Sequence, residues 1–119
     1  IERAVAGMNT WGSPAHRDES RAREMAERAY DRAFDPVGVG RQFAAVGAAG
    51  SWADELPGVT TPTLVMHGDA DTLIDISGGR RTAELIPDAR FVVIEGMGHD
   101  YPPALWPRWV SEWTSFVRS

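Results

Sequence analysis

The sequence predicts an α/β fold in which two parallel strands pack against helices. Two short apolar runs, Thr63–Met66 and Phe91–Ile94, are rich in residues that favour strands. Neither run alternates apolar with polar residues, which is typical of strands buried on both faces. A helical pattern over residues 77–86 separates the two runs, and this strand–helix–strand order predicts parallel pairing.

The first half of the chain predicts helices. Residues 1–17 combine weak helical spacing with a turn near their end, so this stretch stays loosely assigned. Asp18 is suited to cap a helix whose apolar stripe extends to Phe34. Asp35, followed by a first-turn proline, predicts the start of a second helix, which the glycines within 47–50 would end.

A last helix is expected after Pro102 and Pro103. Its apolar residues recur at helical spacing, so we expect this face, tryptophans included, to lie in the core. The residues concerned are Leu105, Trp106, Trp109, Trp113 and Phe116.

The composition excludes several classes of function. A net charge of −5 and a pI of about 5.1 argue against nucleic acids and anionic membranes as partners, because both need a basic face. The chain has no cysteine, which excludes disulfides, thiolate nucleophiles and cysteine-based metal sites. No apolar run approaches the ~20 residues of a membrane span. We expect a cytoplasmic protein.

Asp71 and His99 are the strongest candidates for chemistry. Each follows the end of a predicted strand, and the loops beyond the carboxyl ends of parallel strands are where sites form in such sheets. Histidine suits the role of a general base because its pKa lies near neutrality, and a carboxylate behind it holds the imidazole in one tautomer. Gly96 and Gly98 allow the loop before His99 to bend sharply.

The residues Pro62–Asp71, Leu85–Ala89 and Gly96–His99 closely resemble the C-terminal part of α/β-hydrolase-fold enzymes, such as small bacterial esterases. In that family the acid lies in a His-Gly-x-x-Asp loop, which matches Asp71. The general base lies in a Gly-x-Gly-His loop, which matches His99. The resemblance therefore implies two members of a Ser-His-Asp triad in this chain.

The same resemblance implies a division of the chain. Residues 1–50 would form a helical cap, or lid, and residues 51–119 the C-terminal part of the hydrolase core. The family's nucleophile motif, G-x-S-x-G, is missing, and neither Ser51 nor Ser77 has its flanking glycines. Since the chain also begins at Ile1 rather than Met, we expect a fragment that lacks the nucleophile.

A partner is expected because two strands alone make a poor sheet. The partner would be the missing N-terminal hydrolase segment or a second copy of the chain. The parent protein is expected to hydrolyse a small, apolar, ester-like substrate without a cofactor or metal, and the isolated chain to be inactive. Candidate substrate contacts are the aromatic residues Trp11, Phe34, Phe43 and Trp52, although packing within the cap is their commoner role.

Three other interpretations stay open. Residues 69–75 superficially resemble the Asp-x-Asp start of haloacid-dehalogenase-like phosphatases, but the spacing to Thr72 differs and the family's lysine is absent. A metal site of His67, Asp69, Asp71 and His99 is conceivable, although nothing in the spacing requires it. The chain could also be a catalytically idle accessory chain of a hydrolase. Asp69 is the alternative to Asp71 as the acid.

Overall fold

A computed structural model describes all residues from 1 to 119. Its two strands, β1 (Leu64–Gly68) and β2 (Arg90–Ile94), pair in parallel, with Leu64 opposite Arg90 and Gly68 opposite Ile94. The predicted parallel pairing is therefore confirmed. The helices are α1 (Glu2–Trp11), α2 (Glu19–Arg32), α3 (Pro36–Ala49), α4 (Ile76–Leu85) and α5 (Trp106–Val117).

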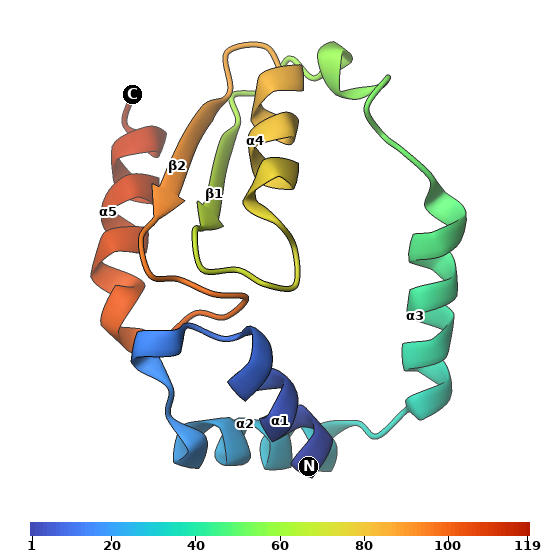
Figure 1. The fold of residues 1–119 in the computed structure, drawn as a ribbon. Coiled ribbons are helices and arrows are strands. Elements are labelled where there is room, and N and C mark those ends of the chain that lie inside the picture. Colours follow the sequence, from blue (N-terminus) through green and yellow to red (C-terminus); the bar gives the residue numbers. More distant parts are fainter.

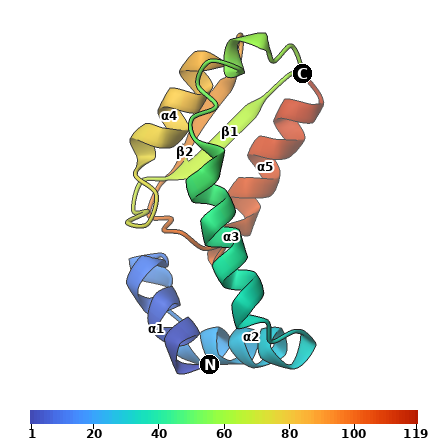
Figure 2. The same cartoon turned by 90° about the vertical axis from the view of Figure 1, so that its right-hand side faces the viewer.

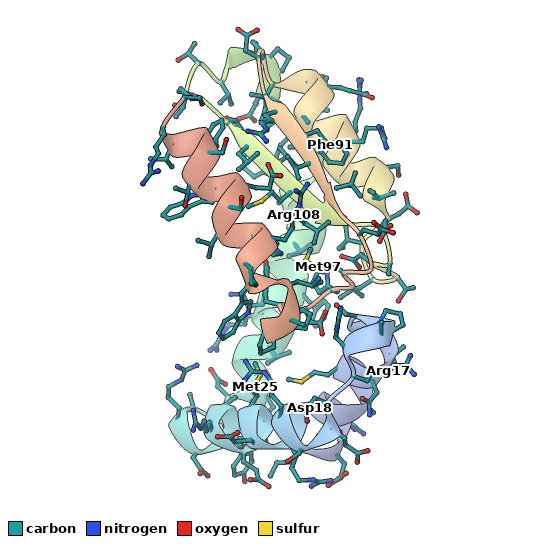
Figure 3. The ribbon with its side chains drawn as sticks, turned by 90° about the vertical axis from the view of Figure 1, so that its left-hand side faces the viewer. Arg17, Asp18, Met25, Phe91, Met97 and Arg108 are labelled. Carbon is teal, nitrogen blue, oxygen red and sulfur yellow. The ribbon has the colours of Figure 1, made fainter.

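The elements form two layers (Figure 1). The sheet lies between α4 and α5, as Figures 1 and 2 both show. The carboxyl ends of both strands face a second layer, made by α1 and α2. Helix α3 stands to one side and leads the chain back to the sheet. Figure 3 shows Met25 in the helical layer, and Phe91 and Met97 in the sheet layer.

Aspartate caps start the helices where the sequence predicts them. Asp18 accepts a hydrogen bond from the backbone N–H of Arg21, and Asp35 does the same for Gly38. Each bond satisfies one of the amides that a helix leaves without an internal partner at its start. The predicted helices after Asp18 and Asp35 are therefore confirmed. Helix α1 takes up the stretch that the sequence left loosely assigned.

The apolar core is split between the two layers. One cluster joins α1 to α2 through Val5, Ala22 and Ala26. The other lies between β2 and α5 around Val92, Ile94 and Met97, with Leu64, Met66, Leu105 and Trp109 against it.

The expectation that both strands are buried on both faces is wrong for this chain. Most of β1 is only half-buried, and Val93 in β2 is exposed. Each strand has a single strand neighbour, and one helix on either side of the sheet does not cover every apolar side chain. The apolar pattern of a strand shows which side chains favour burial, but the number of neighbouring elements determines how far those side chains are buried.

The expectation for the tryptophans of the last helix is also wrong in part. Trp109 packs into the core cluster, but Trp106 is exposed and Trp113 is 61% exposed. The buried face of α5 instead includes Glu112, whose carboxylate pairs with Arg90 on β2 and Arg108 on α5. The helix is turned so that its stripe at 105, 109, 112 and 116 faces the sheet.

Helix α3 contrasts with the rest because none of its residues is buried. Its apolar side chains Val37, Val39, Phe43 and Val46 are all exposed, Phe43 at 76%. None of the helices is both long enough and apolar enough to cross a membrane.

Candidate active site

Two loops leave the carboxyl ends of the strands and carry the candidate residues. The Asp loop (residues 69–75) follows β1, and the His loop (residues 95–101) follows β2. Because the strands are parallel and adjacent, both loops emerge at one edge of the sheet, facing α1 (Figure 1). The α1 turn (residues 11–13) lies against the His loop, and His99 donates its backbone N–H to Trp11 O at 2.6 Å.

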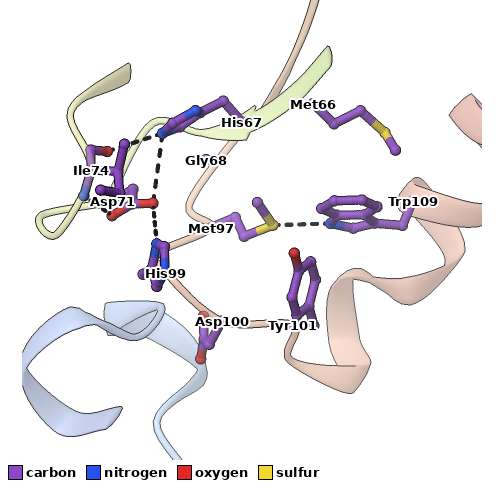
Figure 4. Close-up of a pocket in the computed structure, with 11 residues that line it drawn as sticks. Met66, His67, Gly68, Asp71, Ile74, Met97, His99, Asp100, Tyr101 and Trp109 are labelled. Carbon is purple, nitrogen blue, oxygen red and sulfur yellow. Dashed lines mark hydrogen bonds and ion pairs between the residues drawn. The ribbon is translucent and has the colours of Figure 1, made fainter. Parts of the chain in front are cut away.

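Asp71 and His99 meet across this edge (Figure 4). Asp71 Oδ2 lies 2.8 Å from His99 Nδ1, a hydrogen-bond distance. A carboxylate only accepts hydrogen bonds, so Nδ1 carries the proton and Nε2 is left as an acceptor. The Asp71 side chain is 6% exposed and the His99 side chain 46%. The arrangement is a buried acid behind an accessible imidazole.

The Asp loop holds Asp71 as a carboxylate. Its Oδ1 accepts the backbone N–H groups of Leu73 and Ile74, each at 2.9 Å. Burial alone would raise the pKa of Asp71, but these two N–H bonds and the His99 contact together lower that pKa below its ordinary value. Asp71 is therefore ionised at neutral pH and able to orient His99.

The neighbouring polar residues have other partners. His67, at the end of β1, lies 3.0 Å from Ile74 O through its Nε2 and 3.6 Å from Asp71 Oδ2. Asp69 accepts the N–H of Gly96 at 2.7 Å, and so ties the Asp loop to the His loop. His67 thus supports the Asp loop, and Asp69 links that loop to the His loop. The structure assembles no group of three or more His, Asp or Glu side chains that could hold a metal ion.

The His loop takes its shape from glycines. Gly96 has φ of +72°, in the left-handed region that glycine adopts without strain. Gly68, at the end of β1, lies so close to the carbonyl of Met97 that a Cβ there would overlap it. The loop therefore turns sharply and then packs directly against the strand end.

Two shallow hollows flank His99. The first, of about 190 Å³, lies between the strand ends and α5, and Asp71, Met97, Tyr101 and Trp109 contribute to its lining (Figure 4). Trp109 donates its indole N–H to Met97 Sδ at 2.9 Å, and this bond fixes the apolar wall of the hollow. The second, of about 170 Å³, lies between α1 and His99. Neither hollow is lined by a serine.

The predicted substrate contacts are scattered. Trp11 lines the second hollow, beside His99. Phe34 packs on Tyr30 beyond the end of α2, with ring centroids 4.9 Å apart. Phe43 and Trp52 are exposed, and neither they nor Phe34 lines a hollow at His99. Of the four aromatic residues, the structure brings Trp11 alone to the candidate site.

Sequence reasoning missed Ser13. This residue is 0% exposed, and its hydroxyl contacts the His loop at Gly98 and Asp100. A serine within a turn carries no local sign of such a role, since its partners lie 85 and 87 residues further along the chain. Gly12, next to Ser13 in the sequence, and Gly98 were the only residues whose type indicated that the two backbone segments could approach closely.

Comparison with known proteins finds similarity to two kinds of enzyme. The chain is 34% identical over 98 residues to a rhodomycin D methylesterase from Streptomyces sp. (strain C5), and 35% identical over 98 residues to one from Streptomyces peucetius. Each match covers 82% of this chain and 32% of the relative. A non-heme chloroperoxidase from Kitasatospora aureofaciens is 41% identical over 49 residues, covering 40% of this chain and 18% of that protein.

The chain thus spans about a third of the methylesterases and less of the chloroperoxidase. No family model matches the sequence. The similarity to methylesterases and haloperoxidases supports the α/β-hydrolase resemblance drawn from the Asp and His motifs.

Proposed function

We propose that this chain supplies the acid and the base of a serine hydrolase of the α/β-hydrolase fold, acting on a carboxylic ester or related acyl compound. In this proposal residues 1–50 serve as a helical cap and residues 51–119 as the C-terminal part of the core. The observation that carries it is the 2.8 Å contact between buried Asp71 and accessible His99, on loops from adjacent parallel strands. The two methylesterases among the relatives favour an ester as substrate.

The chemistry follows from the protonation state of the pair. His99 Nε2 accepts the proton of a serine hydroxyl as that oxygen attacks the ester carbonyl carbon. The resulting imidazolium is stabilised by the Asp71 carboxylate and returns the proton to the departing alkoxide. Water then attacks the acyl-enzyme by the same route, releasing the acid and restoring the serine. Asp71 stays ionised throughout.

The nucleophile is proposed to lie outside residues 1–119. No serine lines either hollow beside His99, and the one buried serine of the His-loop junction, Ser13, has its hydroxyl engaged by Gly98 and Asp100. A further hydrolase segment, or a second copy of the chain, would also pair with the half-covered strands. Of the four aromatic residues predicted as substrate contacts, Trp11 is the one that lines a hollow beside His99, and it is proposed to contact the substrate.

The small size of the hollows supports a substrate pocket that is formed jointly by this chain and further elements outside it. At about 190 Å³ the larger one falls below the ~300–1,000 Å³ typical of ligand pockets. Additional elements would enclose the apolar acyl or alkoxy group against Met97 and Trp109. No cofactor enters this scheme.

The test uses the complete natural protein that carries this sequence, with an activated acetate ester as substrate. His99→Ala is expected to lower kcat ~10³-fold or more, because triad members act as a unit. His16→Ala is the matched control, since His16 lines neither hollow, and it should leave kcat unchanged. Near-full activity of His99→Ala would end the proposal.

A second measurement locates the nucleophile. A fluorophosphonate probe, which reacts with activated serines, should label a serine outside residues 1–119 and should fail to label His99→Ala. A polypeptide of residues 1–119 alone should give negligible ester hydrolysis until that segment is added. Labelling of a serine within 1–119 would contradict the assignment. A complete protein with no reactive serine would instead support an idle accessory chain.

A further inference from the structure

Three consecutive residues of the His loop are bonded to the α1 turn, Gly98 and His99 through their backbone N–H groups and Asp100 through its side chain. His99 donates its N–H to Trp11 O at 2.6 Å, and Gly98 donates its N–H to Ser13 Oγ at 2.9 Å. Asp100 Oδ1 accepts both the hydroxyl of Ser13, at 2.5 Å, and the N–H of Ser13, at 2.8 Å. His99 is therefore held on both sides by the same serine.

The two segments also approach too closely for any side chain between them. A Cβ at Gly98 would lie 2.6 Å from both Ser13 N and Trp11 O, and closer still to the carbonyl carbon of Gly12. Gly12 and Gly98 are both buried. The contact is thus backbone against backbone, and these atoms cannot move aside as a flexible side chain would.

The same end of α1 reaches the Asp loop. Thr72 donates its hydroxyl to Thr10 O at 3.3 Å. One end of one helix therefore touches both loops that carry the acid–base pair. The separation of these loops is set partly by the sheet register and partly by this shared support.

We propose that Ser13 is a positioning residue, whose buried hydroxyl sets the placement of the His99 imidazole through the flanking residues Gly98 and Asp100. The His99 side chain is 46% exposed, so packing around the ring restrains it little. Its one side-chain hydrogen bond is to Asp71. What remains to fix the ring is the placement of residues 98–100, and Ser13 binds the backbone N–H of Gly98 on one side of His99 and the carboxylate of Asp100 on the other. The catalytic consequence rests on the proposed function.

Ser13→Ala removes both hydroxyl bonds and leaves the N–H of Gly98 buried without a partner. Because an error of about 1 Å in a reacting group can cost ~10²-fold in rate, we expect kcat to fall ~10–100-fold in the complete natural protein. KM should change by less than ~2-fold, since Ser13 lines neither hollow where substrate would bind. Ser111→Ala, at an exposed serine of α5, is the matched control and should change neither constant.

Asp100 provides a second pair of variants should Ser13→Ala fail to fold. Asp100 also lines the larger hollow, so its two variants are compared with each other: Asp100→Asn keeps the oxygen that accepts from Ser13 and should lose clearly less kcat than Asp100→Ala. Asp100→Ala removes that oxygen and should reproduce the fall in kcat. Equal losses in both Asp100 variants would overturn the proposal, because they would assign the effect to charge rather than to the hydrogen bonds.

A spectroscopic measurement separates positioning from simple loss of stability. The proton on His99 Nδ1, bonded to Asp71, should give a downfield NMR signal that is missing in His99→Ala. Ser13→Ala should shift or broaden that signal at a temperature where the protein is fully folded, whereas Ser111→Ala should not. An unchanged signal together with an unchanged kcat would overturn the positioning role.

The outcomes of His99→Ala and Ser13→Ala keep the two proposals apart. Natural activity in His99→Ala would remove the proposed function. A loss in His99→Ala with full activity in Ser13→Ala would leave that function in place and remove the positioning role alone.

Discussion

The junction between the α1 turn and the His loop, and helix α3, lie at opposite extremes of packing in one chain. At the junction, Gly12, Ser13 and Gly98 are buried, and Ser13 bonds to Gly98 and Asp100, which lie 85 and 87 residues further along the chain. Helix α3 has 14 residues, and none of them is buried. Its start is held by local contacts to Asp35, whose carboxylate accepts the Gly38 N–H and pairs with Arg41.

The comparison shows that interactions between residues close in sequence determine one region, whereas interactions between residues distant in sequence determine the other. Short-range signals, such as an aspartate cap followed by proline, are sufficient to specify where α3 begins. The geometry of the Asp71–His99 pair depends on contacts between segments that are far apart in sequence. The same type of substitution should therefore have opposite effects in the two regions.

Gly98→Ala should have the largest effect. Its Cβ would overlap backbone atoms of the α1 turn, which we expect to cost about 2–3 kcal/mol in the free energy of unfolding. Gly47→Ala in α3 is the matched control, since a Cβ there meets nothing within 4 Å. Alanine in a helix interior is favoured over glycine by ~0.5–1 kcal/mol, so this variant should be stabilised. Denaturant unfolding measures both, and equal effects would erase the contrast.

The loss of folding stability in acid should also depend on the candidate site, through Asp71. The folded-state pKa of Asp71 is lower than its ordinary value of 3.8 because Ile74, His99 and Leu73 donate to the carboxylate against the opposing effect of burial. Its stabilising contribution is therefore fully present above the unfolded-state pKa, and is lost as pH falls below about 3.8 and through the folded-state pKa.

Asp71→Asn should accordingly lower the unfolding free energy at pH 6 and flatten its fall in acid. Unfolding curves of both proteins between pH 6 and pH 2 measure this, and the difference between them isolates Asp71 from other carboxylates. Parallel curves over the whole range would show that Asp71 is not held as a carboxylate in the folded protein.

Phe43→Ser should have the smallest effect. The Phe43 ring is 76% exposed, so its removal should change the unfolding free energy by no more than ~0.5 kcal/mol. A loss near the ~3–5 kcal/mol typical of a buried phenylalanine would show that another segment covers α3 in the natural protein. Ala26→Ser in the α1–α2 cluster gives the comparison, because Ala26 is buried.

Much of the fold was predictable because its signals are local. Apolar runs, cap residues and helical spacing located the strands and most helices, and the two glycine-containing motifs predicted Asp71 and His99 as a pair, which the structure brings into contact. Burial was predicted less well. Val93 and Trp113 have the pattern of core residues, yet their exposure depends on how many elements surround them.

The supporting residues of the site were not predictable in the same way. Ser13 is buried by a contact with a loop 85 residues away, and no residue near Ser13 in the sequence indicates that contact. Glu112 offered a weak signal, since it interrupts the apolar face of α5 at helical spacing from Trp109 and Phe116. Its partner Arg90 lies on β2, so the pairing became visible only with the packing of α5 on the sheet.

The span between Ser13 and Asp100 also sets an order of events during folding. Helices α1 and α2 adjoin in sequence and pack through Val5 and Ala22, so they can associate soon after synthesis. The α1 turn must wait, its hydroxyl and amides solvated, until a loop 87 residues later has been made and β2 has joined β1. Contacts with such long loop closures form late. We therefore expect the contact between Asp71 and His99 to form late in folding, after both layers exist.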